Sequence, residues 1–182
     1  MTDTEPGLVL AAQRGDREAF AQLYEENVTR VFRYLRARLS EPSDAEDITA
    51  GVFIKAMQAL PAYKQRGAPF GAWLLRIAHN ELATFYKKRA RRNETTLEEA
   101  VIASEDPTQV ALEQIAFSEV QAAMGGLTEL QQQVIGLRFG SGLSIIETAQ
   151  AMDRKEGAVK FLQHSAIEAL RRELEARGQY GE

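Results

Sequence analysis

Cysteine is absent from the 182-residue chain, so disulfides, thiolate catalysis and cysteine-ligated zinc or iron–sulfur centres are excluded. The two histidines, His79 and His164, are far apart in the sequence and lack neighbouring ligand-type residues, so we expect no metal site and no cofactor. Long apolar segments are also missing, and the first residues lack the basic and apolar stretches of a signal peptide. These absences predict a cytoplasmic protein that does not insert into a membrane.

Motifs of catalysis are scarce as well. The chain has no Gly-rich phosphate loop, no nucleophile elbow and no acid–base pair with supporting context. We therefore expect a protein that is not an enzyme and whose function rests on binding other molecules.

Strand patterns are the third absence, because apolar residues recur mostly at helical spacing rather than in alternation. Gly and Pro stand between the periodic segments, which predicts an all-α fold class. Asp16 is a candidate N-cap, and Thr128 with Gln131 and Ser144 with Glu147 are candidate capping boxes. The expected helices cover residues 17–40, 44–60, 70–92, 108–124, 129–139, 145–152 and 156–177.

Charge is distributed unevenly along the chain, whose net charge is -4. Residues 1–92 carry 15 Lys and Arg against 11 Asp and Glu, whereas residues 93–126 carry seven acidic residues and no Lys or Arg. Because salt screens exposed charges beyond about 8–10 Å, local patches decide binding more than the total does. We expect a flexible acidic linker at 93–107 between two small helical domains, residues 1–92 and residues 108–182.

The helix expected at 70–92 combines an apolar stripe with a basic end. Phe70, Trp73 and Ile77 follow the spacing of a single helix face. The cations at 87–92 complement the negative end of the helix dipole. Cations beside aromatic rings also suit a nucleic-acid strand, which offers phosphates and stackable bases. A solvated basic helix end is the alternative, and Trp73 is either a core residue or a platform for a base.

The last two expected helices, joined by a tight turn at 153–155, have the helix-turn-helix arrangement. The second helix of this motif enters the major groove of DNA, but such helix pairs also occur in proteins that never bind DNA. The inward face is expected to contain Val159, Leu162, Ala166 and Leu170. The outward face is expected to contain Gly157, Ala158, Lys160, Phe161, His164 and Ser165.

Four motifs follow one another along the chain: Leu8-Val-Leu-Ala-Ala-Gln-Arg-Gly-Asp-Arg-Glu-Ala-Phe, Asp44-Ala-Glu-Asp-Ile-Thr, Trp73-Leu-Leu-Arg-Ile-Ala-His-Asn, and Gly142-Leu-Ser with Glu147 and Gly157-Ala-Val-Lys. In this order and spacing, the chain resembles the extracytoplasmic-function (ECF) group of the sigma-70 family of bacterial RNA polymerase sigma factors. The resemblance implies a sigma-2-like helical bundle and a sigma-4-like helix-turn-helix domain. It also implies a transcription initiation factor that binds core RNA polymerase, directs it to promoters and helps melt DNA.

The resemblance also assigns roles to individual residues. Docking on the β′ clamp helices of core polymerase is implied for Asp44, Glu46, Asp47, Ile48, Thr49, Val52 and Phe53. Recognition and opening of the −10 element is implied for Tyr63, Lys64, Arg66, Trp73, Arg76, His79 and Asn80, with Lys87, Lys88, Arg89, Arg91 and Arg92 on phosphates. Recognition of the −35 element is implied for Arg154, Lys155, Ala158, Lys160, Phe161, His164 and Ser165. The β flap of the polymerase and, in many family members, an anti-sigma factor are the further partners.

Two segments depart from the family pattern. Ala50 and Gly51 stand where the family has Gln-Glu, and a Gly inside a helix costs about 1 kcal/mol relative to Ala. Phe161 and Leu162 stand where the family often has Ser-Arg, and Ser165 replaces a further Arg. These changes predict altered docking on β′ and fewer phosphate contacts in the last helix.

Two other functions are compatible with parts of the sequence. A helix-turn-helix regulator would bind duplex DNA on its own, but it would have no use for the motifs at 44–92. An adaptor or decoy would bind polymerase without initiating transcription, which the altered residues at 50–51 and in the last helix suggest.

Overall fold

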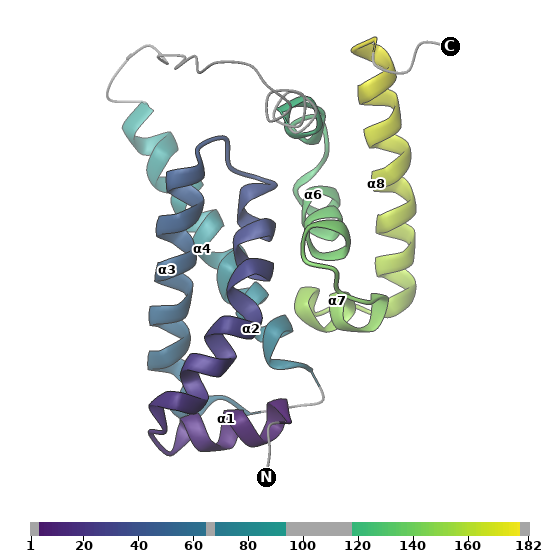
Figure 1. The fold of residues 1–182 in the computed structure, drawn as a ribbon. Helices are drawn as coiled ribbons and strands as arrows, with labels where there is room; N and C mark the ends of the chain where they lie inside the picture. Colours follow the sequence, from purple (N-terminus) through teal and green to yellow (C-terminus); the bar gives the residue numbers. More distant parts are fainter. Residues whose placement is uncertain (1–3, 65–67, 94–117, 179–182) are drawn as a thin grey trace, which may run out of the picture.

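The computed structural model describes residues 4–64, 68–93 and 118–178, and the regular structure in these ranges is helical throughout, which confirms the all-α prediction (Figure 1). The N-terminal half consists of α1 (Glu5–Gln13), α2 (Arg17–Arg36), α3 (Pro42–Ala59), the 3-10 turn η1 (Leu60–Ala62) and α4 (Phe70–Asn93). The C-terminal half consists of helical residues 118–124, α6 (Glu129–Ile135), the π-helical turn η2 (Gly136–Gly140), α7 (Ile145–Met152) and α8 (Glu156–Ala176). The predicted linker beyond residue 93 and the first part of the helix predicted at 108–124 lie outside the described residues.

The helix starts follow the capping signals in the sequence. The Asp16 carboxylate accepts hydrogen bonds from the backbone amides of Glu18 and Ala19 and so begins α2. Both predicted capping boxes are present, at the starts of α6 and α7. Helix α3 begins at Pro42 rather than near residue 44, because proline has no amide to satisfy and fits the first helical turn.

Helix α1 was not predicted, and it fixes both ends of the connection between α3 and α4. The Gln13 side-chain amide donates to the carbonyls of Leu60 and Tyr63 at 2.9 and 2.7 Å. The Glu5 carboxylate accepts a hydrogen bond from the backbone amide of Phe70 at 2.7 Å, at the first residue of α4. The aromatic residues of this connection are therefore held by hydrogen bonds from a separate helix.

The core of the N-terminal half lies between α2, α3 and α4. Its largest fully buried side chains include Leu23, Leu35, Phe70, Leu74 and Leu82. Helices α2 and α4 approach closely at Gly71, where a Cβ atom would lie 2.7 Å from the side-chain oxygen Oδ1 of Asn27. Any larger residue at position 71 would force the side chains of Asn27 and Arg30 to shift.

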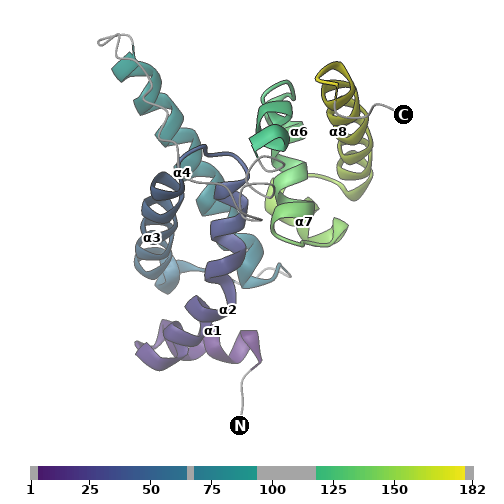
Figure 2. The ribbon, with the colours of Figure 1, turned by 45° about the horizontal axis from the view of Figure 1, so that its top comes forward.

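The C-terminal half packs on this core, as the adjacent ribbons in Figures 1 and 2 show. A Cβ atom at Gly136 would lie 3.0 Å from the buried ring of Tyr34, so η2 comes close to α2 because position 136 is a glycine. The Gln121 side-chain amide donates to the carbonyls of Arg36 and Leu39 at 2.9 and 2.5 Å, near the end of α2. Three apolar residues of the C-terminal half join the core of the N-terminal half: Leu137, Leu143 and Ala151.

A second, smaller core holds the C-terminal half together. It contains Met124, Leu127, Val134, Ile135, Ala149, Val159 and Ala166. Leu162 and Leu170 of α8 pack against it, so the predicted inward face of α8 is confirmed. Among the helices of the described ranges, none combines the length and the apolar character that a membrane span requires.

Candidate nucleic-acid interface

An aromatic groove lies where the connection from η1 meets α4. The rings of Tyr63 and Trp73 are tilted by 37° with their centroids 4.4 Å apart. Phe70 lies behind them, with its ring centroid 5.9 Å from that of Tyr63 and 5.3 Å from that of Trp73. Phe70 is fully buried whereas Tyr63 and Trp73 are half-buried, so Phe70 supports two rings that reach the surface. Trp73 packs against the core, which confirms the first of its two predicted interpretations, and it also lines the groove.

The groove has a volume of about 440 Å³ and carries cations beside the rings. Lys64 and Arg76 lie on its edge, and the Arg76 side chain is 48% exposed. The described residues that line it are Tyr63, Lys64, Ala68, Ala72, Trp73, Arg76, Gln150 and Asp153. Four residues predicted to recognise the −10 element therefore lie together here: Tyr63, Lys64, Trp73 and Arg76. Aromatic faces beside cations suit an unpaired strand.

The opposite wall of the groove comes from the end of α7. Asp153 places a carboxylate oxygen 3.8 Å from a guanidinium nitrogen of Arg76. The Asp153 side chain is almost fully exposed, and exposed ion pairs contribute little to stability. A phosphate at Arg76 would compete with this carboxylate for the guanidinium group.

Asp153 also ends α7 and shapes the turn that follows. Its backbone is left-handed, with φ 53° and ψ 50°, a conformation that Asp tolerates better than most residues with a side chain. The amide of Arg154 then donates back to the carbonyl of Ala149 at 2.9 Å. The predicted short helix, tight turn and long helix are thereby confirmed as α7, residues 153–155 and α8.

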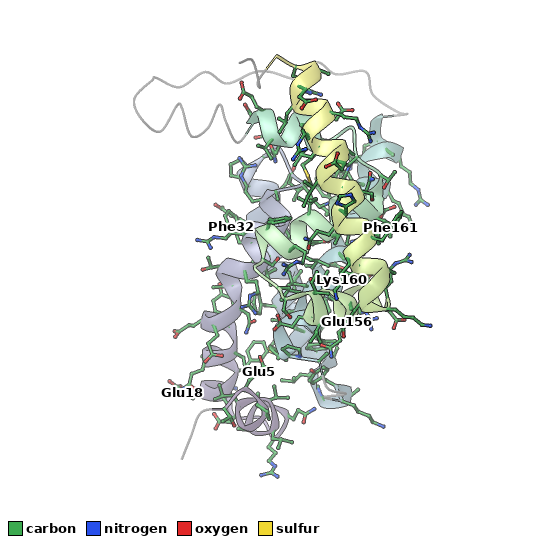
Figure 3. All side chains as sticks on the ribbon, turned by 90° about the vertical axis from the view of Figure 1, so that its right-hand side faces the viewer. Glu5, Glu18, Phe32, Glu156, Lys160 and Phe161 are labelled. Carbon is green, nitrogen blue, oxygen red and sulfur yellow. The ribbon has the colours of Figure 1, made fainter. Side chains whose placement is uncertain are left out.

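The outward face of α8 is largely as predicted. The exposed residues at its start and along this face are Arg154, Lys155, Gly157, Ala158, Lys160, Phe161 and His164. Figure 3 looks onto the α8 side of the molecule, where Lys160 and Phe161 are labelled. Cations and an apolar ring therefore share the surface that a helix-turn-helix protein presents to the major groove.

Comparison with known proteins gives a consistent match over both halves. The family Sigma-70 region 2 matches residues 23–92, and the family Sigma-70, region 4 matches residues 123–172. The ECF RNA polymerase sigma factor SigD of Mycobacterium tuberculosis is 33% identical over 180 residues, which cover 95% of this chain and 85% of SigD. The chain belongs to the ECF RNA polymerase sigma factors. This sigma factor is thus a transcription initiation factor, and the class of independent duplex-binding regulators is not favoured.

Other relatives agree with this assignment. The ECF RNA polymerase sigma factor BldN of Streptomyces coelicolor is 37% identical over 170 residues, which cover 92% of the present chain and 64% of BldN. The structure of CnrH in complex with the cytosolic domain of CnrY matches with a TM-score of 0.75 and 24% sequence identity. The match covers 96% of the present chain and 99% of the solved one. The latter likeness shows that the fold is shared.

Three of the predicted polymerase contacts on α3 are buried in the core of the sigma factor itself: Thr49, Val52 and Phe53. These side chains present little surface in this structure, and their role in docking stays a prediction. Glu46 and Asp47 are exposed, and Asp44 and Ile48 are half-buried. A Cβ atom at Gly51 would have no atom of the described residues within 4 Å, so packing inside the chain gives no reason for a glycine at this position.

Two exposed apolar residues of α3 were missed. Ile54 and Met57 are 53% and 55% exposed. With Asp47 and Ala50 they form an outward stripe at the spacing i, i+3, i+7, i+10. This helical spacing was visible in the sequence. The buried face of α3 is also apolar, however, and the predicted polymerase contacts were placed partly on that face.

Ser165 and His79 are placed differently from the other candidates. The Ser165 hydroxyl donates to the Leu162 carbonyl at 3.1 Å and accepts from the Gln131 side chain at 3.4 Å, so Ser165 turns toward α6 rather than outward. The reason is its position on the flank of α8, about 100° before the buried Ala166. His79 lies outside the set of groove-lining residues and contacts α2 instead.

His79 belongs to a hydrogen-bonded contact between α4 and the end of α2. Its Nδ1 lies 3.1 Å from the Tyr34 hydroxyl, and Arg38 donates to the same hydroxyl oxygen at 3.2 Å. Burial lowers the pKa of His79, the Arg38 charge lowers it further, and Glu129 opposes this shift. Neutral His79 with an unprotonated Nδ1 can accept a hydrogen bond from the Tyr34 hydroxyl group, whereas the protonated ring cannot.

The stability of the sigma factor should therefore fall as the pH falls below 6.5, the ordinary pKa of histidine. Since the folded pKa is lowered, the unfolded chain binds the proton first, and the stabilising contribution of neutral His79 is lost on acidification. Urea unfolding between pH 7.5 and 5.5 measures this slope, and His79→Gln should reduce it. His164→Gln, which removes a histidine from an exposed site on α8, is the matched control. An unaltered slope in His79→Gln would contradict the assignment.

The remaining −10 candidates follow α4 away from the groove. Asn80 is exposed one turn beyond Arg76, and Arg66 lies outside the described residues. The five cations at 87–92 are exposed at the far end of α4, about 20 Å from Arg76 at 1.5 Å per residue. Arg89 lies there 3.9 Å from the carboxylate of Asp44, at the start of α3. The basic end could therefore contact phosphates several nucleotides away from the groove.

Proposed function

We propose that the sigma factor docks on core RNA polymerase through α3, holds an unpaired base of the −10 element in the aromatic groove and reads the −35 element with α8. The observation that carries this proposal is the presence in one chain of an aromatic, cationic groove and an exposed recognition helix. A duplex-binding regulator would need only the helix. The groove gives the chain a means of stabilising a melted strand.

The energetics of strand opening favour these residues in the groove. Extruding a base from a duplex costs a few kcal/mol of stacking and pairing. Stacking on an aromatic side chain returns about 1–3 kcal/mol per base, so Tyr63 and Trp73 can offset much of this cost. Lys64 and Arg76 add phosphate contacts at the groove edge. This role needs binding energy and no catalytic group, so we propose that the chain is not an enzyme.

The end of α7 lies against the groove that would hold the unpaired strand. Asp153 lies against Arg76 and shares the groove wall with Gln150. We therefore propose that the C-terminal half separates from the groove when the sigma factor joins polymerase and promoter. The acidic composition of 93–107 supports its assignment as the linker between domains at 1–92 and 108–182.

The family suggests the remaining partners. The β′ clamp helices would take the α3 stripe, and the β flap would take the C-terminal half. An anti-sigma factor would act as an inhibitor, and the site of action would be the cytoplasm, where the polymerase works.

The proposal is tested by retention on core polymerase and by run-off transcription from genomic fragments with the full chain. We expect retention on core and specific transcripts. Ile54→Asp should reduce the affinity for core at least about tenfold, because a charge at an apolar interface must be desolvated without a partner. Leu10→Asp makes the same kind of change at a similarly exposed site on α1, which the proposal assigns to no partner, and should retain core binding.

Two outcomes would contradict the proposal. Tight, specific binding to a promoter duplex without core would favour an independent regulator. Retention on core without any transcript would favour an adaptor or decoy.

A further inference from the structure

Phe161 is the most exposed large apolar side chain of the described residues, with 72% of its surface accessible. It lies in the second turn of α8 (Figure 3). At about 100° per residue, this position is on the side opposite to the buried Val159 and Ala166. The inward face of α8 is complete without it, since the second core is filled by other residues. Packing within the chain therefore gives no reason for an aromatic ring at this position.

The surroundings of Phe161 are cationic. Arg154 and Lys155 precede α8, Lys160 is adjacent to Phe161, and all three are exposed. Between residues 154 and 161 Glu156 is the single acidic residue, and the exposed Asp153 directly precedes this segment. Cations around an apolar ring fit a polyanion that also offers an apolar group, and they fit an apolar protein surface poorly.

The residues one turn before Phe161 have little or no side chain. Gly157 and Ala158 are both exposed on the same side of α8. A Cβ atom at Gly157 would have no atom of the described residues within 4 Å, so packing inside the chain does not require this glycine. A helix glycine costs about 1 kcal/mol relative to alanine. A compensating benefit would be a close approach of the helix backbone to another molecule.

We propose that Phe161 selects a thymine in the −35 element by packing its ring on the 5-methyl group of the base. Among the base edges of the major groove, that methyl is the apolar group. The small residues 157 and 158 let the start of α8 approach the groove floor, and the flanking cations bind the phosphates on either side. This inference rests on the proposed role of α8 and adds the base that Phe161 recognises.

The test replaces each thymine of the −35 element singly with deoxyuridine, which lacks only the methyl group. Holoenzyme reconstituted from core and the full chain should bind one such promoter about fourfold more weakly, the value of burying one methyl group. Phe161→Ala should weaken binding to the thymine promoter and remove the difference between thymine and deoxyuridine at that position. Phe161→Leu should keep part of the difference, because it keeps an apolar side chain.

Phe139→Ala is the matched control. Phe139 is 59% exposed on η2, outside α8, and its truncation should leave the deoxyuridine effect unchanged. Since Phe161 is exposed, Phe161→Ala should unfold at the same urea concentration as the original chain.

Three results would overturn the inference. They are a −35 element without thymine, deoxyuridine substitution without effect at every thymine, and an undiminished effect in Phe161→Ala. In each of these cases the proposed function stands if scrambling the −35 element still abolishes initiation. If scrambling has no effect, the proposed role of α8 itself is wrong.

Discussion

Phe70→Ala is expected to lower the free energy of unfolding by about 3–5 kcal/mol, the usual loss for a buried phenylalanine truncated to alanine. The ring is fully buried between the rings of Tyr63 and Trp73 and the N-terminal core. Small domains are stable by about 5–15 kcal/mol, so this change removes a large part of the total. Urea denaturation followed by circular dichroism measures the shift of the midpoint.

Phe139→Ala is the control for the Phe70 variant, because it removes the same atoms from an exposed site. Its effect should stay within about 0.5 kcal/mol. Similar losses in the two variants would show that the ring of Phe70 contributes no more than an exposed ring. The support that it gives to the groove would then have to come from the backbone contacts of α1.

Tyr63→Ala is expected to reduce promoter opening by about 5–150-fold, which corresponds to 1–3 kcal/mol of lost base stacking. The Tyr63 phenol is neutral at physiological pH, as tyrosine ordinarily is, and burial, with a smaller contribution from Glu5, raises its pKa further, so its face can stack on a base. Permanganate reactivity of unpaired thymines in the −10 element measures opening. Retention on core polymerase should not change, because Tyr63 lines the groove and is not part of the exposed stripe of α3.

Tyr63→Phe separates the ring from its hydroxyl group. The hydroxyl makes a long contact of 3.5 Å to the Ala68 carbonyl, so its removal should have little effect on opening. If Tyr63→Ala weakened core binding as much as opening, or if Tyr63→Phe were as defective as Tyr63→Ala, stacking would be the wrong explanation.

Local signals in the sequence predicted the local structure well. The Asp16 cap and the two capping boxes are all formed, since each depends on residues within three positions of one another. The inward face of α8 follows from its apolar spacing. Helix α1 was missed because residues 8–12 are uniformly apolar or small and show no helical period.

Features that depend on distant segments were not predicted. The burial of Thr49, Val52 and Phe53 is decided by which face of α3 meets α2 and α4, and both faces of α3 carry apolar residues. The residues around the aromatic groove were grouped by family resemblance, yet its second wall comes from α7, far along the chain. The approach of Gly136 to Tyr34 likewise has no local signal.

The core shared by the two halves couples their separation to every binding event that needs it. Leu137, Leu143 and Ala151 would become exposed to water if the C-terminal half moved away from α2 and α4. For a partner that binds only the separated form, the apparent affinity equals the intrinsic affinity multiplied by the fraction of molecules in which the halves are separated. Weakening this contact would raise promoter affinity without altering any residue that touches DNA. The strength of an internal hydrophobic contact would thus set the fraction of molecules that can bind a promoter.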